Sequence, residues 1–180
     1  MKKRIFAIAL ALSMSLGTVS AYAQTQTSTQ PMQLSEYEIL LGSSYVLNYA
    51  YPIRSHSDEL TIIVSHAPAY YDYNLMRSSM PTHISLVNMK IADLEKLNQT
   101  ITNGKVEAFY AIQPQLNKII AAGKLYVDGC NKVYNGNAQG FSMVNSASSS
   151  IHDAQLEIAV YCDNLYGTFK YGLDTLFPSN

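Results

Sequence analysis

The clearest helical pattern of the chain lies in residues 109–133, FYAIQPQLNKIIAAGKLYVDGCNKV. Apolar and small residues recur there at alternating spacings of three and four, which places them on one face of an α-helix. This stripe consists of Phe109, Ile112, Leu116, Ile119, Gly123, Tyr126, Cys130 and Val133. Pro114 is expected to kink or split the helix, because proline lacks an amide hydrogen. The pattern predicts a helix from Lys105 to about Tyr134, ended by Asn-Gly-Asn at 135–137.

Two further helices are predicted on either side of this one. A stripe over residues 84–101 follows Thr82, which is a good helix cap, and ends at Asn103-Gly104. A second stripe covers residues 151–176. The stretch between the last two helices, residues 136–149, is rich in Gly, Asn and Ser, and this composition favours a loop.

The pattern is less uniform before residue 82. Ser35 and Glu38 match a capping box, and a four-residue repeat of apolar residues follows until Pro52, where the helix is expected to stop. Its members are Tyr37, Leu41, Tyr45 and Tyr49, with Leu40 beside them. Residues 57–66 fit a helix or a short strand, and we favour a helix because no convincing second strand exists to pair with it. The predicted fold is all-α, an antiparallel helical bundle of about four main helices plus a short helix.

The N-terminus has the features of an export signal. Lys2, Lys3 and Arg4 precede an apolar run over residues 5–16, and Ala21-Tyr22-Ala23 offers small residues at a cleavage site. We therefore expect a signal peptide at 1–23, a mobile N-terminal tail at 24–34 and a single helical domain at 35–180. The expected location is periplasmic or secreted.

Two cysteines, Cys130 and Cys162, remain after this processing. Disulfides are the usual state of paired cysteines in an oxidising compartment, so the sequence predicts a bridge between them. Both residues lie on the apolar stripes of their helices. If the first helix runs to about Gln139 and the next starts near Ser149, an ideal antiparallel hairpin leaves the two positions about 6 Å out of step along the helix axis, so the predicted bridge is a strained one.

Charge and hydropathy exclude several classes of partner. The formal net charge is −1, and removal of Lys2, Lys3 and Arg4 leaves 9 basic residues against 13 acidic ones. A mildly acidic chain gains little from a phosphate backbone, so no nucleic acid is expected as a partner. No later stretch approaches 18 consecutive apolar residues, so the mature chain is not expected to span a membrane.

Common catalytic motifs are missing, and the chain shows no nucleotide-binding glycine pattern. Tyr70, Tyr71 and Tyr73 crowd a segment after Pro68 and are candidates for an interaction surface, because exposed Tyr clusters are enriched in binding sites. We expect a non-enzymatic protein that binds another protein, such as an inhibitor, immunity or adaptor protein, with no cofactor and no metal site.

Two alternatives remain open. One is a small-ligand or metal-binding bundle, for which His56, Asp58, Glu59 and His66 supply ligand types within eleven residues. The other is an enzyme without a local motif, with His66, His83 or His152 as a base. The oligomeric state cannot be derived from the sequence.

Overall fold

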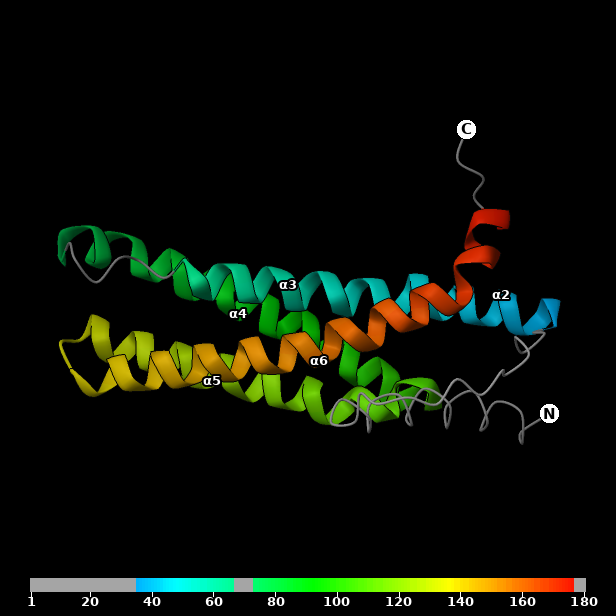
Figure 1. The fold of residues 1–180 in the computed structure, drawn as a ribbon. Helices are drawn as coiled ribbons and strands as arrows, with labels where there is room; N and C mark the ends of the chain where they lie inside the picture. Colours follow the sequence, from blue (N-terminus) through cyan, green and yellow to red (C-terminus); the bar gives the residue numbers. More distant parts are fainter. Residues whose placement is uncertain (1–34, 67–72, 177–180) are drawn as a thin grey trace, which may run out of the picture. The chain divides into compact units, whose positions relative to one another are not determined.

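The computed structural model describes residues 35–66 and 73–176, and within these ranges the backbone is all-helical, with no strand (Figure 1). The elements are α2 (Glu36–Tyr45), η1 (Val46–Ala50), α3 (Tyr51–Ser65), α4 (Tyr73–Asn103), η2 (Glu107–Ile112), α5 (Gln113–Tyr134) and α6 (Gln139–Leu176). The predicted class, an all-helical bundle with four long helices, is confirmed. The open question over residues 57–66 is settled as helix.

The chain divides into two compact units. One unit contains the residues up to Pro52 together with those from Val160 onward, and the other contains Ile53–Ala159. The predicted signal peptide and tail, residues 1–34, lie outside the described residues. The single helical domain expected for 35–180 stays a prediction.

Four helices lie side by side in the unit formed by Ile53–Ala159, and they alternate in direction along the chain (Figure 1). The core is made by the apolar stripes that the sequence shows. A Cβ atom placed on Gly123 of α5 would lie 2.8 Å from Ile91 of α4 and 3.8 Å from Leu60 of α3, so three helices meet closely at this glycine. All eight residues of the stripe over 109–133 are buried.

The turns after α4 and α5 have the same construction. The amide of Val106 donates to the Ile101 carbonyl at 3.0 Å, and the amide of Asn137 donates to the Lys132 carbonyl at 2.8 Å. Such bonds close a helix when the residue before the donor is left-handed. Gly136 fills that position after α5 with φ 80°, and Lys105 fills it after α4 with φ 50°.

Three prolines show how tertiary packing modifies local preference. Pro114 lies in the first turn of α5 with the 3₁₀ turn η2 before it, so the expected split is confirmed. The prediction that Pro52 stops the N-terminal helix is wrong, because the π-helical turn η1 leads directly into α3 and Pro52 is the second residue of that helix. Pro81 lies inside α4, although the sequence suggested that the helix starts after it.

The predicted loop at 136–149 is wrong. Helix α6 starts at Gln139, and its first turns pack against the end of α5. A Cβ atom on Gly140 would collide with the Gly129 carbonyl oxygen and would lie 2.7 Å from the Val133 amide nitrogen. The helix forms because Gly140, Val144, Ala147 and Ile151 are buried at helical spacing, and this packing outweighs the local preference of Gly, Asn and Ser for loops.

The predicted disulfide is also wrong. Cys130 and Cys162 are both buried, and no disulfide joins them. Since α5 ends at Tyr134 and α6 starts at Gln139, Cys130 lies four residues from its end of the turn and Cys162 lies 23 residues from the other. Antiparallel helices bring together positions equally far from their turn, and a disulfide requires Cα atoms within about 7 Å. The early start of α6 therefore removes the register that the bridge needs.

Hydropathy agrees with this packing. Within the described residues, no helix combines the length and the apolar character that crossing a bilayer requires.

Candidate functional site

An exposed apolar stripe runs along the N-terminal helix of the first unit. Tyr37 is 67% exposed, Leu40 50%, Leu47 45% and Tyr51 71%, and the exposed Ser44 lies between the two leucines. Their spacings of three, four, three and four residues and the exposure of all five side chains place them along the solvent side of this segment. We call these five residues the exposed seam. A run of large apolar side chains in water is costly, so such a stripe marks an interaction site more often than a scattered apolar residue does.

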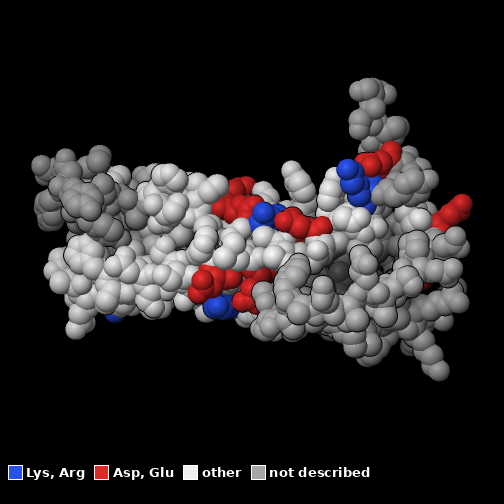
Figure 2. All heavy atoms as spheres, in the orientation of Figure 1, with Lys and Arg blue, Asp and Glu red and all other residues white. Residues whose placement is uncertain are grey.

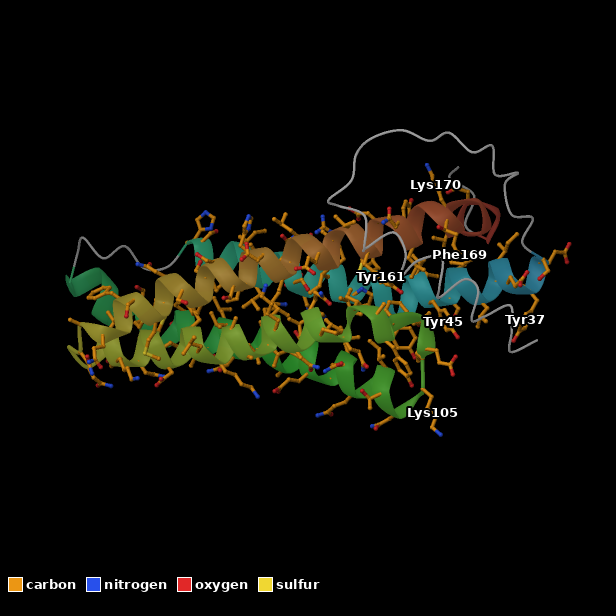
Figure 3. The ribbon with its side chains drawn as sticks, turned by 60° about the horizontal axis from the view of Figure 1, so that its bottom comes forward. Tyr37, Tyr45, Lys105, Tyr161, Phe169 and Lys170 are labelled. Carbon is orange, nitrogen blue, oxygen red and sulfur yellow. The ribbon has the colours of Figure 1, made fainter. Side chains whose placement is uncertain are left out.

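The opposite side of this helix is built from small residues. Gly42 and Ser43 are buried, and Val46 and Ala50 continue the buried face. A Cβ atom on Gly42 would collide with the ring of Phe169 from α6, so the aromatic ring rests directly on the α2 backbone. Figure 3 shows Phe169 projecting toward α2, while Tyr37 projects from α2 away from Phe169. The small residues thus leave the large ones on the solvent side.

This arrangement corrects the predicted core stripe of the helix. Tyr37 and Leu40 are exposed, and Leu41, Tyr45 and Tyr49 are only partly buried. Tyr45 and Tyr49 contact each other edge to face, with ring centroids 6.2 Å apart. The aromatic repeat therefore follows the flank of the helix, and its core face is formed by the small residues that a hydrophobic pattern does not register.

Both ends of the seam have a defined local structure. Ser35 caps α2, since its Oγ accepts from the Glu38 amide at 3.3 Å and the Glu38 carboxylate accepts from the Ser35 amide at 2.8 Å, so the predicted capping box is confirmed. Residues 46–50 form a π-helical turn, which carries Leu47. Such turns are rare in helices and occur frequently at functional sites.

The seam is almost uncharged. Glu36 and Glu38 are the only charged residues between positions 35 and 51. Both lie in the first turn of α2, where their negative charge interacts favourably with the helix dipole. In the middle of the seam, the Asn48 Nδ2 donates to the Ser44 Oγ at 3.0 Å and to the Ser44 carbonyl at 2.9 Å. The Ser44 hydroxyl therefore has a hydrogen-bond partner within its own segment of the chain.

The Tyr cluster predicted from the sequence is not the surface just described. Tyr70 and Tyr71 lie outside the described residues, and Tyr73 is the first residue of α4, with its side chain not described. Their role as an interaction surface stays a prediction.

The four residues considered as metal ligands, namely His56, Asp58, Glu59 and His66, each interact with other side chains or with the backbone. The Asp58 carboxylate accepts from Arg54 at 2.8 Å and from Gln155 of α6 at 2.6 Å. Glu59 pairs with Lys90 of α4. Hydrogen bonds from Lys90 and Ser55 lower the pKa of the Glu59 carboxyl, and burial opposes them. His56 lies 3.6 Å from Asp93, while His66 bonds within the last turn of α3.

These contacts form a network in which ion pairs link α3 to α4 and a hydrogen bond from Gln155 links α3 to α6. Figure 2 shows acidic and basic atoms gathered in the middle of this unit, and the described surface at its left end is almost uncharged. Among the described residues, no group of three or more His, Cys, Asp or Glu side chains is placed to hold a metal ion. His152 lies exposed on α6.

One buried polar cluster lies in the core of the unit formed by Ile53–Ala159. The His83 Nε2 and the Tyr126 hydroxyl are 2.8 Å apart, and the same hydroxyl donates to the Val64 carbonyl at 3.4 Å. Burial raises the pKa of the Cys130 thiol to about 11, although its hydrogen bond with Tyr126 acts in the opposite direction. A thiol that stays protonated at neutral pH is a poor nucleophile, so this cluster is structural in character.

His83 predicts a specific dependence of stability on pH. Burial lowers the pKa of His83 below its ordinary value of 6.5, so the folded protein resists protonation more than the unfolded chain does. The free energy of unfolding is therefore expected to fall as the pH drops below about 6.5, because protonation favours the unfolded state. His83→Gln keeps a neutral hydrogen-bonding group and should reduce this slope. Urea unfolding between pH 7 and pH 4 tests it, and an unchanged slope in the variant would contradict the assignment to His83.

No protein-family model, curated protein or solved structure matches this chain.

Proposed function

We propose that this chain is an exported, non-enzymatic protein that acts by binding another protein, as inhibitors, immunity proteins and adaptors do. The observation that carries the proposal is the exposed seam on α2 and η1. Two tyrosines and two leucines lie there in one line, each 45–71% exposed. Tyrosine is enriched in interfaces and at their energetic centres, because its large, rigid side chain combines apolar area with a hydrogen-bonding tip.

The chemistry of the seam specifies the kind of partner. A narrow apolar stripe on a helix fits an apolar groove, or a second helix with apolar residues at the same spacings. The seam has acidic residues at its first turn alone, so electrostatic attraction contributes little along most of its length. Binding should accordingly change little with salt concentration.

The alternatives have weaker support. A catalytic role would need His66, His83 or His152 as a base, but His83 is buried against Tyr126 and His66 bonds within the last turn of α3. A metal-binding role would rest on His56, Asp58, Glu59 and His66, which face different partners. No observation favours either over a binding function.

Seam variants test the proposal by affinity capture from extract of the export compartment. The double variant Leu40→Ser with Leu47→Ser removes two exposed apolar side chains, so stability should change little while capture of a partner falls at least tenfold. The matched control is Leu86→Ser with Met89→Ser, because these α4 side chains are 41% and 49% exposed and lie in the other unit. Equal capture by the seam variant and the control would contradict the proposal.

Export predicts a shorter mature chain. Cleavage before Gln24 should remove 23 residues, including Lys2, Lys3 and Arg4. Intact-mass measurement of the protein recovered outside the cytoplasm checks this, with Ala21→Tyr and Ala23→Tyr as a variant that blocks cleavage. Recovery of a mature species that retains Lys2 would refute the proposed processing.

A further inference from the structure

We infer that the exposed seam also pairs with a second copy of this chain, as an antiparallel helix pair with a two-fold axis at Ser44. The inference rests on the proposed function in one respect, since both use the same exposed surface. It names the occupant of that surface as the seam of a second copy of the chain.

The sequence of the seam is nearly palindromic. Tyr37 and Tyr51 lie seven residues before and after Ser44, and Leu40 and Leu47 lie four before and three after it. In an antiparallel pair centred on Ser44, Tyr37 faces Tyr51 of the second copy. Leu40 falls within one residue of Leu47 of the second copy. A two-fold interface requires such a self-complementary patch, because each copy presents the same surface to the other.

Charge favours the antiparallel direction. Glu36 and Glu38 are the charged residues of this segment, and both lie at its N-terminal end. A parallel pair would place four carboxylates side by side, which is unfavourable. An antiparallel pair separates the two acidic ends by about 20 Å, since some 14 residues at 1.5 Å each lie between them.

The centre of the interface is formed by a small polar residue. Ser44 is small, which lets the two helices approach closely at the axis. Its hydroxyl accepts from the Asn48 side chain at 3.0 Å within the same chain. The Ser44 hydroxyl therefore keeps an acceptor bond of its own chain when two Ser44 side chains meet, and the leucines on either side close around it.

The area of the seam sets the expected strength. With about 150–250 Å² for a whole aromatic side chain, the exposed parts of the two tyrosines and two leucines amount to roughly 400 Å² per copy. A standard stable interface uses about 800 Å² per partner. The pair should therefore be weak and concentration-dependent, with a dissociation constant of about micromolar or above.

Cysteine cross-linking of the purified full mature protein tests the geometry. Ser44→Cys should give a disulfide-linked dimer under mild oxidation, since the two residues meet at the axis. Tyr37→Cys and Tyr51→Cys should cross-link when mixed with each other and not when oxidised alone. Two controls are used. One is Ser149→Cys, at an exposed position on α6 in the other unit, and the other is the parent chain, whose Cys130 and Cys162 are buried.

Sedimentation equilibrium of the parent chain gives the second readout. The parent should show a monomer–dimer equilibrium, and Leu40→Ser with Leu47→Ser should raise its dissociation constant at least 100-fold, because four apolar side chains leave the interface. A parent that stays monomeric up to millimolar concentration, or self-cross-linking of Tyr37→Cys and of Tyr51→Cys, would overturn the inference. If the chain stays monomeric but captures another protein through the seam, the inference is overturned and the proposed function stands. If the chain shows neither self-association nor seam-dependent capture, both the inference and the proposed function are overturned.

Discussion

Gly140→Ala is expected to lower the free energy of unfolding by about 3 kcal/mol, which is the upper end of the usual cost of overpacking. The new methyl group would collide with the Gly129 carbonyl oxygen and crowd the Val133 amide nitrogen at 2.7 Å. Backbone atoms of a packed helix cannot move aside as a flexible side chain can, so α5 and α6 must separate. The gain of about 1 kcal/mol in helix propensity on replacing Gly with Ala offsets only part of this cost.

Gly167→Ala is the matched control for this substitution. Gly167 lies in the same helix, and a Cβ atom there would meet nothing within 4 Å. The control should be neutral or more stable by up to about 1 kcal/mol. Urea unfolding followed by far-UV circular dichroism compares the two variants. An equal or greater stability of Gly140→Ala would show that α5 and α6 do not pack through these glycines.

Tyr126→Ala is expected to destabilise the protein by about 3–5 kcal/mol, the usual cost of deleting a large buried aromatic side chain. Tyr126 is 0% exposed, and its hydroxyl lies 2.8 Å from the His83 Nε2. Tyr126→Phe separates the two contributions, because it keeps the ring and removes only the hydroxyl. Its cost should be about 1–3 kcal/mol, since His83 then loses its buried partner.

The same unfolding measurement distinguishes these outcomes. A Phe variant as unstable as the Ala variant would mean that the hydroxyl, and not the packing of the ring, dominates at this position. A Phe variant as stable as the parent would mean that the His83 contact contributes nothing to the fold.

The sequence predicts the core of the larger unit well because its large apolar residues keep a strict helical spacing. Val87, Ile91 and Leu94 of α4 are buried as expected, and so are Ile151 and Ile158 of α6. Burying a large apolar side chain gains the most free energy, so the helical spacing of such side chains marks the buried face. Prediction from this spacing therefore works where the core consists of large side chains.

The same rule fails where small residues make the core. Gly140 and Ala147 bury the start of α6, and Gly42 and Ser43 bury α2, yet none of these residues stands out in a hydrophobic pattern. The predicted loop at 136–149 and the predicted core stripe of Tyr37 and Leu40 were both wrong for this reason. The spacing of Gly140, Val144, Ala147 and Ile151 is the signal that extends the last helix to its true start.

The exposed seam was missed for a related reason. Large apolar residues on a helix are assigned to the core by default. The N-terminal helix has one stripe of large residues and one of small residues, and the sequence does not show which of the two is buried. Only the position of Phe169 against Gly42, which is a contact far apart in sequence, decides which stripe faces solvent. The disulfide failed because its register depended on the length of the connection between α5 and α6.

Hydroxyl-radical footprinting tests most directly whether the exposed seam is the working surface of the protein. The mature protein is labelled at high dilution, where self-association is absent, first alone and then at the same concentration in extract of the export compartment. The account predicts that labelling of Tyr37, Leu40, Leu47 and Tyr51 falls at least threefold in the extract, while labelling of Leu86 and Met89 stays unchanged. Unchanged labelling of the seam, or equal protection of Leu86 and Met89, would contradict it.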